Sequence, residues 1–236
     1  MNLFKNVHES WIPLLHSLAY NEPMVSFLDS LKDKSIQPPL ALIFKVFEMP
    51  VDKIKVVILG QNPYPRPGTA VGRAYAVPKE TRMPAILEFI QKEVLRYQLN
   101  PIAMSSMLTG NWQALEHWTE QGVFLLNTAL TVDTEGGNHA LEWKEFTEKV
   151  IAFISQENPC IWMLWGTYAH AFGNYILNPL EVEKYDDELM EDIPVDPLLN
   201  YTVSGLHPIS GPGFSKEGFI KVNSLLEKRS LTKIMW

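Results

Sequence analysis

The chain has 236 residues, of which 46% are hydrophobic and 20% are charged. This composition is typical of a globular protein, and the length predicts one domain over residues 1–236. A single cysteine, Cys160, excludes an internal disulfide and any four-cysteine metal site. No apolar run approaches the ~18 residues of a membrane span, and the first residues lack a signal-peptide pattern, so we expect a cytoplasmic protein without membrane contact.

The formal net charge of −7 would argue against a nucleic-acid binder if it were spread over the chain. It is instead concentrated in Glu181–Asp196, which holds eight acidic residues and one lysine. The remainder is neutral overall, so nucleic acid is not excluded as a partner. We expect an acidic insertion at about 180–198, which is either a solvated loop or a lid or protein-partner surface.

The predicted helices and strands alternate along the chain. Apolar residues at helical spacing predict helices over 8–18 and 23–31 and a short amphipathic stretch at 40–47. Further helices are predicted over 85–97, 111–120, 143–155, 168–177 and 219–228. Between them, four apolar runs too short for helices predict buried strands: Val56–Leu59, Val123–Leu126, Cys160–Trp165 and Tyr201–Leu206.

Strands that alternate with helices predict an α/β fold, a three-layer α/β/α sandwich with a central four-stranded parallel sheet. Each strand leads into a polar loop, and these loops read GQNPYP, NTALTV, WGTYAH and HPISGPG. Ligands of such sheets bind at the carboxyl ends of the strands, so we expect the loops to form the functional site. The chain has neither GxGxxG nor GxxxxGK[ST], which disfavours a dinucleotide or P-loop site.

The loop motifs resemble those of a known family. VVILGQNPYPRPG resembles the first motif of family 1 uracil-DNA glycosylases, whose usual form is VVILGQDPYHGPG. Segments similar to that family's later motifs follow in order, so the resemblance covers about residues 38–230: GVFLLNTALTV, WKEFTEKVI, LWGTYAH, HPISGPGFS and NSLLEKR. It implies a monofunctional DNA glycosylase that flips a pyrimidine nucleotide, hydrolyses its N-glycosidic bond and leaves an abasic site. It implies DNA as partner and no metal or cofactor, and we expect a monomer.

The resemblance also implies roles for particular residues. Asn62 lies where the family's water-activating aspartate sits, and His207 corresponds to the residue that hydrogen-bonds O2 of the departing base. Four residues are expected to bind the base: Gln61 by polar contacts, Tyr64 by crowding C5, Tyr75 by stacking and Asn127 by reading the Watson–Crick edge. The expected DNA contacts are Pro84, Ala85, Ile209, Ser210, Gly211 and Gly213.

Several residues depart from the family pattern. Asn62 can orient water, but it cannot act as a base and brings no negative charge beside the developing oxocarbenium ion. Pro65 replaces a histidine, and Met83-Pro84-Ala85 replaces a proline–serine motif. The HPISGPGFS loop is shorter than usual and lacks the leucine wedge, for which Ile209 is the candidate substitute.

These departures leave more than one function open. The substrate is uracil or a modified pyrimidine, and modified phage DNA would make the protein a defence enzyme; Tyr64 argues against a bulky C5 substituent. The alternative is a catalytically weak or inactive DNA-binding or scaffold homologue, which Asn62 favours and Asn127 and His207 oppose. Without the resemblance, Asn127 could cap a turn and Tyr75 could be a core aromatic.

Overall fold

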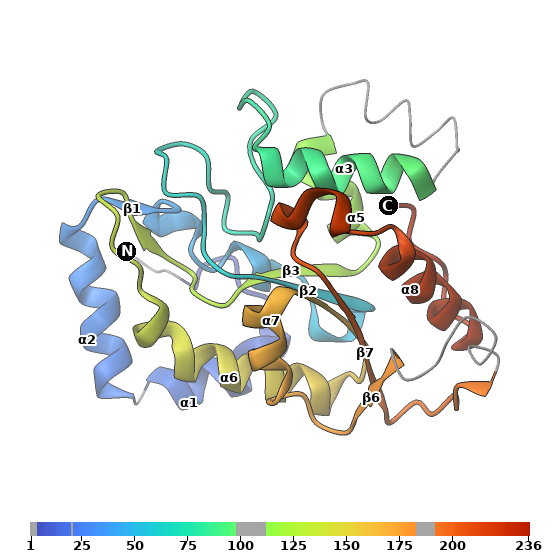
Figure 1. Cartoon of the computed structure of the whole chain (residues 1–236). Coiled ribbons are helices and arrows are strands. Elements are labelled where there is room, and N and C mark those ends of the chain that lie inside the picture. Colours follow the sequence, from blue (N-terminus) through green and yellow to red (C-terminus); the bar gives the residue numbers. More distant parts are fainter. Residues whose placement is uncertain (1–3, 20, 98–111, 183–191) are drawn as a thin grey trace.

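A computed structural model describes residues 4–19, 21–97, 112–182 and 192–236 (Figure 1). Its centre is a parallel sheet in the order β3 (Val123–Asn127), β2 (Val56–Gly60), β5 (Ile161–Trp165), β7 (Asn200–Gly205) and β6 (Pro179–Glu181). The predicted α/β fold with a parallel sheet is confirmed. The sheet has five strands rather than four, because β6 adds a short strand along β7.

Helices cover both faces of this sheet (Figure 1). One core contains residues of α1 (Ile12–Ala19), α2 (Glu22–Ser30), α6 (Ala140–Glu157) and α7 (Gly166–Gly173). The other contains residues of α3 (Ala85–Tyr97), α5 (Glu116–Glu120) and α8 (Glu217–Lys228). Along β2, Val57 and Leu59 pack into the first core, while Val56 and Ile58 pack into the second. The three layers are therefore those that the sequence predicts.

The smaller elements differ from the predicted helices. The stretch at 40–47 forms two 3₁₀ helices, η3 (Leu40–Leu42) and η4 (Lys45–Glu48). Residues 112–120 form η6 (Trp112–Ala114) and α5, which are separated by Leu115 at φ 51°, a left-handed conformation that ends the first turn. The remaining short elements are η1 (Glu9–Trp11), η2 (Leu31–Asp33), η5 (Val51–Lys53), η9 (Pro208–Gly213) and the antiparallel pair β1 (Ile36–Gln37) and β4 (Val132–Asp133).

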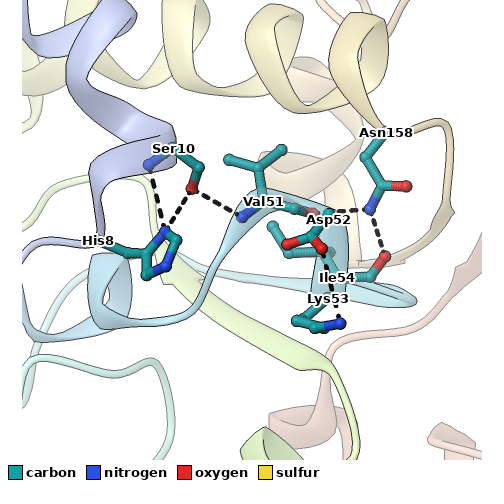
Figure 2. A network of polar contacts seen from close by, with 7 residues as sticks. All are labelled: His8, Ser10, Val51, Asp52, Lys53, Ile54 and Asn158. Carbon is teal, nitrogen blue, oxygen red and sulfur yellow. Dashed lines mark hydrogen bonds and ion pairs between the residues drawn. The ribbon is translucent and has the colours of Figure 1, made fainter.

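Polar side chains fix the segment that leads into β2 (Figure 2). The Ser10 hydroxyl accepts a hydrogen bond from the Val51 backbone at 3.1 Å and lies 3.0 Å from His8 Nδ1. From the end of α6, the Asn158 amide donates to the carbonyls of Val51 and Ile54, at 2.7 Å each. These bonds join the N-terminal part, η5 and α6, and so fix where β2 begins.

The sheet opens between β2 and β5. Their ladder ends at the Ile58–Met163 pair, whereas β2 stays paired with β3 as far as Gly60. This gap is also where the strand order reverses, because β3 lies on one side of β2 and β5 on the other. A crevice at such a reversal is the usual ligand site of open α/β sheets.

Residues 183–191, the centre of the predicted acidic insertion, lie outside the described residues. The interpretation of the insertion as a lid or partner surface stays a prediction. Within the described ranges, no helix combines the length and the apolar character that crossing a bilayer would require.

Candidate active site

A cavity of about 430 Å³ opens at the gap between β2 and β5. The loops that follow four strands contribute to it: Gln61 and Asn62 follow β2, Asn127 ends β3, Thr167 follows β5 and His207 follows β7. This volume lies within the range of sites that bind small ligands, about 300–1,000 Å³. The predicted catalytic and base-binding residues therefore all line one cavity.

The Asn127 carboxamide lies directly against Gly60. A Cβ atom at Gly60 would lie 2.4 Å from Asn127 Oδ1 and 2.8 Å from Ala74 Cβ, so only glycine allows this approach. Asn127 is 6% exposed, and it lines the cavity. Its carboxamide carries one acceptor and two donors for a ligand in the cavity.

The proton position on His207 follows from its local contacts. The Ile209 backbone N–H donates to His207 Nδ1 at 3.2 Å, which is the cap of η9. Partial burial lowers the pKa of His207, so the imidazole is neutral near pH 7. With Nδ1 accepting, the proton of the neutral ring lies on Nε2, which makes that atom a donor.

Gly166 allows His207 its position. Its φ is 81°, and a Cβ there would lie 2.9 Å from His207 Cβ. This position therefore favours glycine for two reasons, the left-handed backbone conformation and the lack of space for a Cβ atom.

Asn62 presents an unpaired acceptor. Its Oδ1 is buried and has no hydrogen-bond partner among the described residues. A buried polar atom of this kind costs free energy unless a ligand or water satisfies it. No aspartate or glutamate lines the cavity, so the described lining supplies no negative side chain.

Two tyrosines form part of the wall and are linked to each other. The Tyr64 hydroxyl donates to the Tyr75 carbonyl at 3.3 Å, and the Tyr75 hydroxyl donates to the Leu59 carbonyl at 3.2 Å. Burial raises the pKa of both phenols well above their usual range, so both stay protonated donors. Tyr75 has φ 64°, and the Ala76 N–H bonds to the Ala74 carbonyl, which is the pattern of a strained γ-turn. This turn places the Tyr75 ring 5.5 Å from the Trp165 ring.

Threonine hydroxyls join the first two loops. Thr128 Oγ1 and the Ala129 N–H both donate to the Gln61 carbonyl, at 3.1 Å and 3.0 Å. From α6, Thr147 Oγ1 donates to the Thr128 carbonyl at 2.7 Å. The loop with Gln61 and the strand end with Asn127 are thus held as one unit.

The predicted DNA-contact residues lie beside the cavity rather than within it, apart from Ile209. Ile209 lines the cavity and is 70% exposed. Pro84 and Ala85 precede Ile86, which also lines the cavity, at the start of α3. Ser210, Gly211 and Gly213 belong to η9, which packs against α3. These residues therefore border the mouth, where a polymer substrate would pass.

Eight of the lining residues were not predicted as site residues: Gly60, Pro63, Pro65, Ile86, Trp165, Gly166, Thr167 and Tyr168. All of these except Ile86 belong to GQNPYP or WGTYAH, two of the loops that follow the predicted strands, so the strand-end rule contained the signal. Ile86 could not be found in this way, because it belongs to a helix that reaches the mouth only in the folded chain.

The fold and this cavity define a class, an α/β protein with a ligand-sized cavity at the carboxyl edge of a parallel sheet. Residues 47–208 match the sequence model of the "Uracil DNA glycosylase superfamily". The uracil-DNA glycosylase of Campylobacter fetus subsp. fetus is 34% identical over 98% of this chain and 93% of its own length. That of Psychromonas ingrahamii is 34% identical over 97% of this chain and 99% of its own length.

Solved structures agree with these sequence matches. The mimivirus uracil-DNA glycosylase has a TM-score of 0.75 at 25% identity and covers 100% of this chain and 89% of its own. A variant of the mimivirus UNG in complex with UGI has a TM-score of 0.76 at 26% identity, covering 100% and 91%. The chain belongs to the uracil-DNA glycosylase superfamily and is accordingly a DNA glycosylase, a hydrolase of N-glycosyl bonds.

Proposed function

We propose that this protein removes uracil from DNA and leaves an abasic site. The observation that carries the proposal is the meeting of three groups in one cavity: the Asn127 carboxamide, the Nε2 donor of His207 and the buried acceptor of Asn62. Uracil offers a donor at N3 and acceptors at O4 and O2. The carboxamide oxygen of Asn127 accepts from N3–H, and its NH₂ group donates to O4.

His207 acts on the leaving base. As the glycosidic bond breaks, negative charge develops on the base, and Nε2–H donates to O2 where that charge gathers. The Ile209 N–H fixes the ring tautomer, so the donor is in place before the reaction. The proton stays on His207, because stabilisation of the anion needs a donor and not a transferred proton.

Asn62 positions the attacking water. Its buried Oδ1 accepts one hydrogen of the water and directs the oxygen toward C1′ of the sugar. An amide takes up no proton at neutral pH, so the water loses its proton to bulk solvent or to the departing uracil anion, and only as its oxygen bonds to the cationic sugar. This arrangement gives a slower reaction than a carboxylate would, because no negative side chain stabilises the oxocarbenium ion.

The tyrosines select the base. Tyr75 offers a ring face for stacking, and its hydroxyl bond to Leu59 holds the ring orientation. Tyr64 lies where a C5 substituent would project, and its bond to the Tyr75 carbonyl opposes its rotation out of the way. This pair favours uracil over thymine and over pyrimidines with bulky C5 groups.

The DNA strand is held at the mouth. The uncapped N-terminus of α7, at Gly166 and Thr167, directs backbone N–H groups at the cavity, a geometry that suits a phosphate. Ile209 projects from the mouth and fills the space that the flipped nucleotide leaves. Pro84, Ala85, Ser210, Gly211 and Gly213 line the path of the strand.

The test is release of free base from a duplex that contains one deoxyuridine. We expect the wild-type protein to release uracil and leave an alkali-labile site, and Asn127→Ala to lose activity while retaining binding to undamaged DNA. Equal activity of the two proteins would refute the assigned role of Asn127, and no release by the wild type would refute the function.

A modified pyrimidine remains the second candidate substrate, favoured by Asn62 and Pro65 at positions where the family carries an aspartate and a histidine. A phage-defence role would follow from it. Parallel assays on uracil DNA and on hypermodified phage DNA separate the two candidates, and a strong preference for uracil would exclude the second.

A further inference from the structure

One buried side chain holds the loop that runs from β2 to α3. Gln113 is 8% exposed, and its Nε2 donates to the carbonyls of Pro78, Lys79 and Thr81 at 2.9, 2.6 and 2.7 Å. The Val77 N–H in turn donates to the Gln113 carbonyl at 3.0 Å. An amide has two hydrogens for these three acceptors, so the hydrogens are shared among them. The loop therefore has a fixed shape without forming a helix or strand.

The loop held by Gln113, residues 61–84, which we call the anchored loop, has basic side chains at the surface. Lys79 and Arg82 are both exposed, and Lys79 forms an ion pair with the neighbouring Glu80 at 3.7 Å. Arg82 has no ion pair or hydrogen bond with any described residue. Segment 61–84 holds four basic residues and one acidic residue in a chain whose net charge is −7. This stretch is therefore a local positive region next to the cavity.

Arg82 is close in sequence to a residue that lines the cavity. Ile86, four residues later, lines the cavity mouth. An extended chain covers at most about 3.6 Å per residue, so the two backbones are within about 14 Å of each other. A DNA strand rises about 3.4 Å per nucleotide along its axis but also winds around it, so successive phosphates are about 7 Å apart and this reach spans roughly two of them. The planar guanidinium group of Arg82 carries N–H donors that match a phosphate in a bidentate manner.

We propose that Arg82 binds a backbone phosphate flanking the flipped nucleotide, and that Gln113 is the positioning residue that holds Arg82 there. This inference rests on the proposed function, because it requires DNA at the cavity mouth. Lys79 contributes less, since Glu80 partly offsets its charge.

The experiment measures binding to an undamaged duplex as a function of salt, which needs no chemistry at the base. Each phosphate contact contributes about 0.9 to the slope of log K against log salt. We expect Arg82→Gln to lower the slope by about 0.9 and Arg82→Lys to restore most of it. The matched control is Lys149→Gln, which changes the net charge equally at an exposed residue of α6, in the opposite helical layer. This control should keep the wild-type slope.

A second set of variants tests whether Gln113 positions Arg82. Gln113→Met keeps the length of the side chain and removes its donors, so it should lower the slope as Arg82→Gln does. Adding Arg82→Gln to it should cause no further loss. On uracil DNA, both single variants should raise KM more than they lower kcat. Trypsin should cut after Lys79 and Arg82 faster in Gln113→Met than in the wild type.

The outcomes separate the two proposals. An unchanged slope for Arg82→Gln, with a wild type that binds DNA and releases uracil, overturns the role of Arg82 alone. Additive losses in the double variant overturn the role of Gln113. If Gln113→Met does not fold, rapid trypsin cleavage at Arg82 in the native protein would overturn the anchored loop. A wild type that neither binds DNA nor releases uracil refutes the proposed function itself.

Discussion

Replacing Gly60 with alanine tests how the cavity positions Asn127. The added Cβ would lie 2.4 Å from Asn127 Oδ1 and 2.8 Å from Ala74 Cβ. Ala74 cannot move away easily, because its N–H donates to the Leu125 carbonyl at 2.9 Å. The Asn127 carboxamide is the part that can shift, so it must move away from Gly60.

The distance that the Asn127 carboxamide must move determines the expected loss of catalytic rate. Ordinary contact lies near 3.5 Å, so the carboxamide must move by about 1 Å. A misplacement of about 1 Å at a reacting group costs roughly 10²-fold in rate, which equals about 2.7 kcal/mol in the activation free energy. Overpacking should also lower the free energy of unfolding by about 1–3 kcal/mol.

The assay is kcat/KM for uracil release, together with a thermal melt that shows the variant is folded. Gly218→Ala is the matched control, since its Cβ would meet Met163 Cε at 3.5 Å, an ordinary contact. We expect the control to keep wild-type activity. If folded Gly60→Ala stays within about threefold of the wild type, the reasoning about Asn127 is refuted.

Three further predictions concern titration and charge. Asn62→Asp should raise kcat by about 10-fold or more, because it supplies a base and a negative charge near the sugar; an unchanged single-turnover rate would contradict this. The wild-type rate should be flat above pH ~6.5 and fall as the pH drops through the lowered pKa of His207, since protonated Nδ1 would face the Ile209 N–H; a pH profile without this fall would count against the assigned tautomer. Burial lowers the pKa of His117 to about 4, so the folded state resists protonation below pH ~6.5 while the unfolded state accepts it. Between pH 7.5 and 5 the wild type should therefore lose about 2 kcal/mol of unfolding free energy more than His117→Phe, as measured in urea, and equal losses would refute the shift.

The sequence predicted the strands that carry the site because each is a continuous apolar run ending in a polar loop. Val56–Leu59 and Val123–Leu126 lie within β2 and β3, and the polar residues after them line the cavity. The edge strand β6 was missed, since Pro179–Glu181 is an edge segment with no apolar run and largely exposed residues. Its pairing depends on β7, which is distant in sequence.

Residues whose role depends on a contact between distant parts of the chain also could not be predicted from the sequence. The glycines at 60 and 166 matter because of where Asn127 and His207 lie, and those approaches exist only in the folded chain. Gln113 resembles any polar residue in a loop, because its three carbonyl partners lie more than thirty residues away. The resemblance supplied residue roles, while the structure supplied the tautomer of His207 and the unpaired acceptor of Asn62.

Whether this protein removes uracil from DNA is measured most directly by the product released from a duplex with a single deoxyuridine, identified by chromatography, for the wild type and for Asn127→Ala. We expect free uracil and an abasic site from the wild type, and a large loss of both from the variant at unchanged binding of undamaged DNA. Absence of uracil from the wild-type reaction, or equal release by the variant, would contradict this expectation.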